Sequence, residues 1–414
     1  MSERLRRSKD MYAGDEHGHP SGPDLAGPSI LAYTPDGLGL GHLRRNTNIA
    51  LRFAREIPQA NAIVIGAWPS LVPTECAPGV DFIKLPSLHK TSSHRWRSRS
   101  LRVGLQSLID SRSSMIVAAI EAFDPDLFLV DYTPAGRCEE LLPVLDFLKG
   151  RRKKTKTVLG LRDILDTPDV IRRTWERDGV YGLIERYYDL VLIYGERNLF
   201  DAAEQYGLNL LKRPAVKYCG YVGPDLIEDR HAVAVNEQRS EREKRIVTVG
   251  GAGSVAFETM KQCTEAVALL WSDYDLKCTL ITGPMMDCHE RRMLEQRAAT
   301  LPATVIPYVD NPLEYIRSAD LVIGMAGYNT IVEAVALGKR MLAIPWSSPR
   351  AEQSLRASIF AARGYVTTRQ LEGASPEALA ETIRDCLEAP IATQPQLDLN
   401  GLTMVVAELR ELAQ

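Results

Sequence analysis

The chain has 414 residues, of which 45% are hydrophobic and 25% charged, proportions that exclude a collagen-like or wholly disordered protein. Its 50 Lys and Arg residues against 53 Asp and Glu residues give a net charge of −3, which argues against a strongly basic nucleic-acid-binding protein. The length predicts two or three domains at roughly 100–200 residues each.

Residues 1–27 are expected to form a disordered tail, because they are polar and rich in Gly and Pro. The tail lacks the apolar core of a secretory signal, and no apolar run in the chain approaches the ~20 residues that span a bilayer. The seven cysteines form no C-x-x-C pair, which favours reduced thiols over disulfides or a zinc site. We therefore expect a cytoplasmic protein without a transmembrane segment.

Between residues 28 and 220, short apolar runs that predict strands alternate with longer helical patterns. Strands are expected at Ser29–Tyr33, Ala62–Gly66, Asp81–Leu85, Leu127–Asp131, Thr155–Leu159 and Leu190–Tyr194. Helices are expected at His42–Glu56, Leu101–Phe123, Arg137–Lys149 and Val170–Tyr188. This alternation predicts a parallel sheet with helices on both faces.

The pattern stops at residues 221–245, a Gly/Pro segment and a charged stretch that we interpret as a linker. It resumes in residues 246–414. Strands are expected there at Arg245–Val249, Cys278–Ile281, Thr304–Ile306, Leu321–Gly324 and Met341–Ile344, and helices notably at Ala256–Trp271, Asn329–Leu337 and Glu352–Arg363. The predicted fold class is thus α/β, with two Rossmann-like domains facing each other across a cleft and a last helix able to pack back on the N-terminal domain.

Three glycine-rich loops, at Asp36–Arg45, Val249–Ser254 and Gly324–Thr330, follow predicted strands and precede predicted helices. Such loops let backbone N–H groups approach a phosphate at a helix N-terminus, although a plain tight turn explains the glycines equally well. The first loop has G-x-G-x-G-H in place of G-x-G-x-x-G, and the second strand ends without a carboxylate for a ribose, which disfavours NAD binding. No loop ends in the G-K-[ST] of a Walker motif.

Two acidic residues near predicted helix starts have a structural and a ligand-binding interpretation. Thr330 and Glu333 fit a T-x-x-E capping box, whereas the Glu333 carboxylate is also suited to the two hydroxyls of a ribose. Glu352 complements a helix dipole in a first turn, and Gln353 beside it offers a donor and an acceptor to a sugar.

The segments from Val305 to Glu333 and from Gly338 to Gln353 together resemble the nucleotide-sugar-binding half of GT-B glycosyltransferases. They are most similar to the MurG type, which transfers N-acetylglucosamine from its UDP donor in peptidoglycan synthesis. The resemblance covers most of residues 246–365, and Gly37–His42 supports it in the first domain. It implies a metal-independent, inverting transfer from a nucleoside-diphosphate sugar, UDP-N-acetylglucosamine being one candidate, to an unknown hydroxyl or amine. The UDP-sugar is then a co-substrate, and no cofactor is implied.

Carried over position by position, the resemblance assigns a role to each matching residue. Gly39, Gly41 and His42 would lie where phosphate or acceptor is bound, and the loop of Gly251 and Ser254 would face the donor diphosphate. Arg162 is expected near phosphate from its own position behind a predicted strand, not from the resemblance. On the donor side it implies Val309 at the base through its backbone, Gly327, Asn329 and Thr330 at the diphosphate, Glu333 at the ribose, and Glu352 with Gln353 at the transferred sugar. The family's Q-Q-x-x-N-A pattern has Glu352 in the first Gln position and Arg356 in the Asn position here, which leaves the donor sugar open.

His42 is the leading candidate for the base that deprotonates the acceptor, since an unperturbed imidazole has a pKa of ~6.5. The alternative, which the sequence favours equally, is that His42 only begins the helix and contacts phosphate. Asp131, at a strand end, either orients His42 or acts as the base itself, and Asp163 also follows a strand; buried ion pairing explains both carboxylates equally well. The D-x-D strings Asp124–Asp126 and Asp273–Asp275 precede strands, away from the sheet edge that binds ligands, so no metal site is assigned.

The basic stretch His89–Arg99 is either a solvated loop or a lid for the acceptor, and Arg151–Lys154 is interpreted as a solvated turn. The expected partners are a nucleotide-sugar donor and a small-molecule or lipid-linked acceptor, without nucleic acid, and the oligomeric state is open. Two alternatives remain: a nucleotide-sugar hydrolase or 2-epimerase with the same donor half, and a non-catalytic nucleotide-sugar-binding protein.

Overall fold

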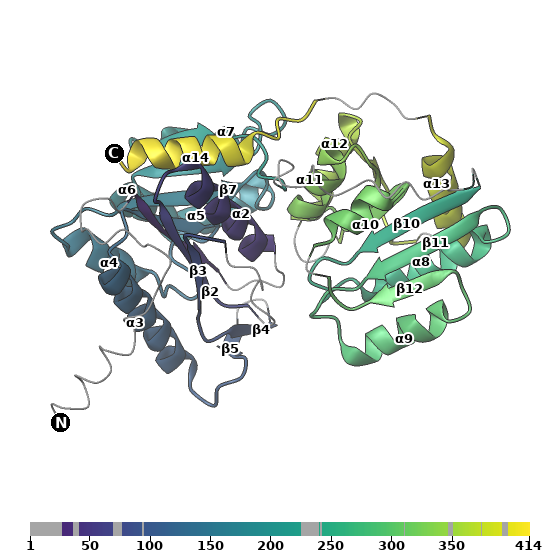
Figure 1. Cartoon of the computed structure of the whole chain (residues 1–414), viewed down its shortest axis with the longest axis horizontal. Coiled ribbons are helices and arrows are strands. Elements are labelled where there is room, and N and C mark those ends of the chain that lie inside the picture. The colour runs from purple at the N-terminus through teal and green to yellow at the C-terminus, as the bar shows by residue number, and fades with distance from the viewer. Residues whose placement is uncertain are drawn as a thin grey trace, which may run out of the picture.

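A computed structural model describes residues 27–35, 41–68, 77–92, 95–224, 240, 242–309, 311–346, 351–373, 375–390 and 396–414. Gly39 and nearly all of the predicted tail therefore lie outside the described residues, as does most of the predicted linker. The described residues form two α/β domains, each built on one parallel sheet (Figure 1). The predicted fold class is confirmed.

The N-terminal sheet has the strand order β3-β2-β1-β6-β7-β8-β9. Its strands are β1 (Ser29–Thr34), β2 (Asn61–Gly66), β3 (Val80–Lys84), β6 (Leu127–Asp131), β7 (Lys156–Arg162), β8 (Leu190–Tyr194) and β9 (Ala215–Tyr218). The helices of this domain are α2 (Gly41–Glu56), α3 (Leu105–Phe123), α4 (Leu142–Gly150), α5 (Pro168–Arg177), α6 (Val180–Tyr187), α7 (Ala202–Gln205) and the short η2 (Leu208–Leu210). Every residue of β6 and β8 is buried, which is why these strands read as continuous apolar runs.

The C-terminal sheet has the order β12-β11-β10-β13-β14-β15. Its strands are β10 (Glu243–Val249), β11 (Asp275–Ile281), β12 (Ala303–Ile306), β13 (Leu321–Gly324), β14 (Arg340–Ala343) and β15 (Thr367–Thr368). The helices are α8 (Phe257–Leu270), α9 (Cys288–Ala298), α10 (Leu313–Ser318), α11 (Tyr328–Ala336), α12 (Glu352–Ala362) and α13 (Pro376–Glu388). The last helix, α14 (Gly401–Leu412), returns to the N-terminal domain and lies beside α2, where Arg52 Nη2 donates to Thr403 Oγ1 at 3.2 Å (Figure 1).

In each sheet the chain winds outward in one direction and then reverses, so that each has a switch point between two neighbouring strands. The reversal lies between β1 and β6 in the first domain and between β10 and β13 in the second. Open α/β sheets bind ligands at such points, at the carboxyl ends of the strands. The ends of these strands and the segments that follow them hold candidate residues: His42 and Asp131 in the first domain, and Gly251, Ser254 and Asn329 in the second.

Several predicted elements are wrong in detail. The stretch His89–Arg99 is not a loop, because β4 (Leu88–Ser92) and β5 (Arg95–Ser98) pair there as an antiparallel hairpin. The helix predicted over Val170–Tyr188 is broken into α5 and α6, because Gly179 adopts a left-handed backbone with φ 65°. The helix predicted from Arg137 begins only with α4.

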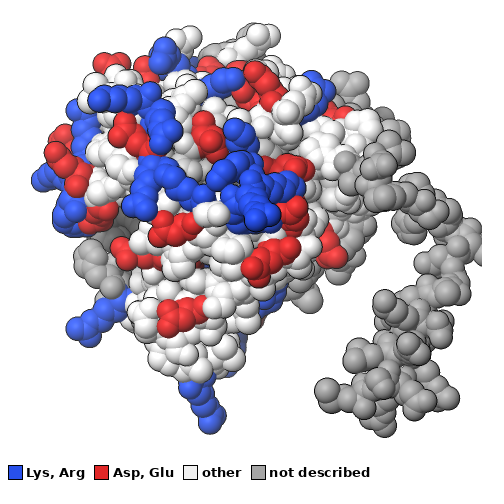
Figure 2. Space-filling model, turned by 90° about the vertical axis from the view of Figure 1, so that its left-hand side faces the viewer, with Lys and Arg blue, Asp and Glu red and all other residues white. Residues whose placement is uncertain are grey.

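Charged side chains on the N-terminal domain are mixed in sign. The face in Figure 2 carries Lys and Arg side chains interspersed with Asp and Glu. At the turn of residues 151–154, three basic side chains are exposed and Lys153 Nζ lies 2.9 Å from Asp126 Oδ1. This turn is a solvated, locally neutralised surface, as predicted.

Candidate active site

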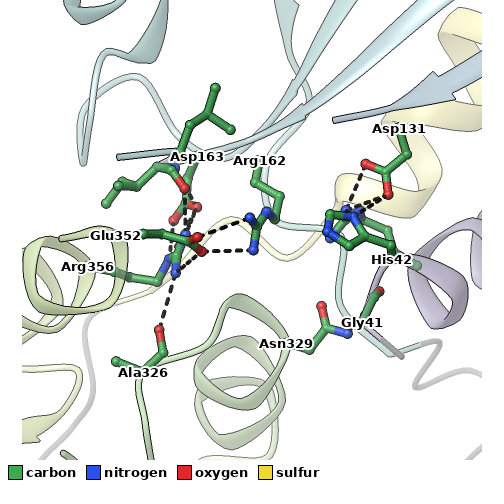
Figure 3. A network of polar contacts seen from close by, with 12 residues as sticks. Gly41, His42, Asp131, Arg162, Asp163, Ala326, Asn329, Glu352 and Arg356 are labelled. Carbon is green, nitrogen blue, oxygen red and sulfur yellow. Dashed lines mark hydrogen bonds and ion pairs between the residues drawn. The ribbon is translucent and has the colours of Figure 1, made fainter. Parts of the chain in front are cut away.

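A cavity of about 320 Å³ opens between the carboxyl ends of the two sheets. The two walls come from different domains. The N-terminal wall consists of Gly41, His42, Arg45, Trp96, Tyr132, Arg137 and Arg162, and the C-terminal wall of residues 249–255, Met325, Gly327, Tyr328, Asn329, Thr330, Trp346, Glu352 and Gln353. The walls touch where Asn329 Nδ2 donates to the carbonyl of Gly41 at 3.2 Å (Figure 3).

His42 and Asp131 form a hydrogen-bonded pair at the first switch point. His42 is the second residue of α2 and Asp131 ends β6; His42 Nδ1 lies 2.9 Å from Asp131 Oδ2 (Figure 3). Arg45, one turn along α2, donates from Nη2 to both carboxylate oxygens at 2.8 and 2.7 Å. The imidazole tautomer that donates from Nδ1 to Asp131 leaves Nε2 as a proton acceptor.

The surroundings keep the imidazole neutral and the carboxylate ionised. Burial lowers the pKa of His42 to about 4; Asp131 opposes this shift, whereas Arg162 and Arg45 add to it. Burial alone would raise the pKa of Asp131, but Arg45 and His42 hold it at about 2. At neutral pH the pair is therefore in the protonation state that a general base and its orienting carboxylate require.

Four charged residues join the two domains beside this pair. Arg162 ends β7 and donates from Nη1 and Nη2 to the Glu352 carboxylate at 2.8 and 3.2 Å. Arg356 donates from Nη2 to Asp163 Oδ1 at 2.8 Å and from Nη1 to Glu352 Oε1 at 3.0 Å (Figure 3). Burial by itself lowers the pKa of Arg356, but the Asp163 and Glu352 carboxylates raise it above its ordinary value.

The glycine loops of the second domain present backbone to the cavity. Gly251 has φ 60°, and a Cβ there would meet nothing within 4 Å, whereas a Cβ on Gly253 would lie 2.6 Å from the carbonyl of Thr282. Gly327 caps α11 without a side-chain hydrogen bond. The first turn of α11 therefore has N–H groups without intrahelical partners at the cavity wall. The capping box of Thr330 and Glu333 is wrong, because the helix begins earlier, at Tyr328.

The structure brings most of the predicted site residues to this cavity. Those on its walls are Gly41, His42, Arg162, Gly251, Ser254, Gly327, Asn329, Thr330, Glu352 and Gln353. Asp131 lies behind His42, and Val309 packs against the apolar core and is not among the described lining residues. Gly39 lies outside the described residues. The individual roles of these residues stay predictions.

Glu333 occupies a different place from the other donor residues. It lines a second, smaller cavity together with Arg44 and Asn329, and Arg44 Nη2 lies 2.6 Å from Glu333 Oε1. Burial raises the pKa of Glu333, and Arg44 opposes this shift. A ribose that binds Glu333 has to share its carboxylate with the guanidinium of Arg44 or displace it.

Sequence reasoning missed an aromatic and cationic part of the N-terminal wall. The ring of Tyr132 is contacted by the guanidinium groups of Arg162 and Arg137, at 4.9 and 5.1 Å from its centroid, and lies 5.2 Å from the His42 ring. Trp96 comes from the hairpin. The position of Arg45, three residues after His42 on one helix, was the available signal for that residue. Trp96 lies within the stretch His89–Arg99, one interpretation of which is a lid for the acceptor, whereas Tyr132 gave no signal.

Among the described residues, no group of three or more His, Cys, Asp and Glu is arranged to hold a metal ion. The D-x-D strings serve structural contacts: Asp126 accepts from the backbone N of Ser29 at 2.9 Å, and Asp273 pairs with Arg384 at 2.9 Å. No helix in the described part of the chain is long and apolar enough to cross a membrane.

The chain has relatives among glycosyltransferases. Residues 246–400 match the glycosyltransferase family 28 C-terminal domain. An uncharacterized glycosyltransferase of Methanosarcina mazei is 25% identical over 363 residues, which cover 85% of this chain and 89% of that protein. The UDP-N-acetylglucosamine–N-acetylmuramyl-(pentapeptide) pyrophosphoryl-undecaprenol N-acetylglucosamine transferase of Thermodesulfovibrio yellowstonii is 34% identical over 100 residues, or 23% of this chain and 26% of that protein.

Solved structures share the two-domain fold. MurG of Acinetobacter baumannii superposes with a TM-score of 0.54 at 14% identity, covering 93% of this chain and 99% of that one. UGT71G1 of Medicago truncatula, complexed with UDP-glucose, superposes with a TM-score of 0.59 at 13% identity, covering 94% and 99%. Together with the family 28 domain, this fold confirms the predicted resemblance: the chain is a MurG-like glycosyltransferase of the GT-B fold.

Proposed function

We propose that the chain is a metal-independent, inverting glycosyltransferase that moves a sugar from a UDP-linked donor to an acceptor hydroxyl or amine. One observation carries the proposal: a single cavity joins the His42–Asp131 pair of one domain to the glycine loops and the α11 N-terminus of the other. A nucleoside-diphosphate sugar and an acceptor bound to opposite walls meet at His42. The free thiols of the described cysteines favour the cytoplasm as the setting.

The C-terminal wall is suited to the donor. In the turn from Gly250 to Gly253 the N–H groups of Gly250 and Gly253 donate to the carbonyls of Ile281 and Gly250. The backbone N–H groups of Gly251 and Ala252, with those of the first turn of α11, are therefore the donors for a diphosphate without a metal ion. Glu352 and Gln353 lie at the start of α12, where a carboxylate and an amide meet sugar hydroxyls. UDP as the nucleotide is supported by the name of the Thermodesulfovibrio relative and by the UDP-glucose complex of the Medicago protein.

The N-terminal wall is suited to activate the acceptor. As the acceptor oxygen or nitrogen forms its bond to C1 of the sugar, its proton passes to Nε2 of His42, and the bond from C1 to the diphosphate breaks on the opposite face, with its electron pair leaving on UDP. The configuration at C1 is inverted. Asp131 stabilises the imidazolium through the Nδ1 hydrogen bond, and Arg45 keeps Asp131 ionised.

The test is release of UDP from UDP-N-acetylglucosamine and UDP-glucose, with and without small-molecule and lipid extracts as acceptor sources. The proposal expects release that depends on an acceptor and is lost in His42→Gln. Arg186→Met is the control, since Arg186 is exposed and pairs only loosely with Asp146 at 3.3 Å. Release at full rate without any acceptor would indicate a hydrolase instead, and a chain that binds neither donor would refute the proposal.

A further inference from the structure

Two successive residues at the end of β7 each hold a charged partner on the other domain. Arg162 binds the Glu352 carboxylate with both Nη groups, and Asp163 binds the guanidinium of Arg356. Glu352 and Arg356 are four residues apart on α12 and are bonded to each other at 3.0 Å. The four side chains therefore form one network of two positive and two negative charges across the domain boundary, in which each charge contacts at least one of opposite sign (Figure 3).

The two residues of α12 that differ from the MurG-type pattern are the two that belong to this network. Glu352 and Arg356 stand where that pattern has Gln and Asn, and each of them finds an opposite charge at the end of β7. A neutral amide at either position would leave Arg162 or Asp163 without an oppositely charged partner on the other domain. The two substitutions and the Arg162-Asp163 pair are thus parts of one arrangement.

The two cross-domain pairs differ in where they lie. Arg356 and Asp163 are completely buried, and Arg356 also donates to the carbonyls of Ile164 and Ala326 at 2.9 and 3.2 Å. Arg162 and Glu352 line the cavity, with 14% and 11% of their side chains exposed. The first pair fixes the domain contact, whereas the second is accessible to a substrate.

Arg162 also lies next to the proposed base. Figure 3 shows its guanidinium between Glu352 on one side and His42 with Asp131 on the other. Its guanidinium carbon lies 4.9 Å from the centroid of the Tyr132 ring, a cation–π contact within the N-terminal domain. Arg162 Nε is buried and has no hydrogen-bond partner among the described residues.

We propose that Arg162 is a cross-domain positioning residue of the transfer reaction, which holds the Glu352 carboxylate of the sugar subsite at a fixed position relative to the imidazole of His42. This inference rests on the proposed function. The planar fork sets the direction of the carboxylate that receives the sugar hydroxyls. Its positive charge, in the same place, disfavours protonation of His42, so that the base stays available while the sugar is held.

The first experiment measures the pKa of His42 by NMR titration of the ligand-free protein, with His42→Gln identifying the resonance. The charged groups that face His42 are Asp131, Arg45 and Arg162. Arg162→Met is expected to raise the pKa of His42 by roughly one pH unit, because a nearby positive charge is removed. Arg162→Lys keeps the charge and is expected to change it much less, and Arg186→Met not at all.

The second experiment compares the affinities for UDP and UDP-N-acetylglucosamine, or UDP-glucose if that is the sugar bound, by calorimetry. Both Arg162→Met and Arg162→Lys lose the bidentate fork, and we expect about tenfold weaker binding of the UDP-sugar with unchanged binding of UDP. A variant that keeps the wild-type affinity for the sugar and the wild-type titration of His42 would overturn the role of Arg162. Wild-type protein that binds neither nucleotide would instead overturn the proposed function.

Discussion

The buried pair of Arg356 and Asp163 gives a sharp test of how the two domains are held together. In Arg356→Met the volume and the helix are largely preserved, but Asp163, only 1% exposed, loses the guanidinium that binds it at 2.8 Å. It retains the backbone N of Ile164 at 2.7 Å and Tyr221 Oη at 3.3 Å. Removing one partner of a buried pair costs about 3–5 kcal/mol, since the other charge stays buried without compensation.

The measurement is urea unfolding followed by tryptophan fluorescence and circular dichroism. A protein of two domains need not unfold in one step, so the midpoint of each transition is compared with that of the wild type. The double variant Arg356→Met with Asp163→Asn no longer has an unpaired buried carboxylate at position 163. We expect its free energy of unfolding to be roughly 1–3 kcal/mol higher than that of Arg356→Met alone.

The control is Arg384→Met, which breaks the exposed pair with Asp273, where both side chains are more than one third accessible. It is expected to leave the midpoints nearly unchanged, because solvent screens the pair. A loss below about 1 kcal/mol in Arg356→Met, or no recovery in the double variant, would refute the reasoning that this pair fixes the domain contact.

Three further predictions concern the cavity. His42→Gln should abolish transfer and leave the affinity for UDP intact. Wild-type turnover should fall only as the pH drops through about 4, because burial lowers the pKa of His42 to that value. A loss of turnover already near pH ~6.5, the ordinary pKa of an imidazole, would contradict this. Because the unfolded imidazole takes up its proton first, near pH ~6.5, folding stability should decline as the pH falls from there toward 4. Glu333→Ala should weaken UDP binding about tenfold in calorimetry if the ribose hydroxyls donate to the Glu333 carboxylate. Arg44→Met should tighten UDP binding, because it removes a donor that competes for the same carboxylate. An unchanged UDP affinity in Glu333→Ala would refute the ribose contact. Gly253→Ala should lower both the Tm and the affinity for UDP, since a Cβ at this position lies 2.6 Å from the carbonyl of Thr282. In Gly251→Ala the new Cβ meets nothing within 4 Å, so this variant should cost only the left-handed backbone strain of about 1–2 kcal/mol. Equal effects of the two substitutions would refute the assigned packing.

Much of the fold follows from local patterns. The strands β1, β6, β8 and β13 are buried over nearly their whole length, so their apolar runs mark them without reference to partners. The hairpin of β4 and β5 was missed because most of its residues are basic or polar, with only Leu88 buried among its described side chains, so that no apolar run marks either strand. The break between α5 and α6 depends on one glycine in a left-handed conformation inside a helical pattern.

The sequence by itself determined the two-domain α/β architecture and the loops that face each other, because strand burial, glycine turns and helix starts are local properties of the chain. It also singled out His42, at a predicted helix start behind a glycine-rich loop, and Asp131, at the end of a predicted strand. Only the tertiary structure decided which charges meet. Arg162 and Glu352 are 190 residues apart, and Arg44 reaches Glu333 from the opposite domain. No local pattern encodes such contacts, since they depend on how two separately formed sheets are oriented across one cleft.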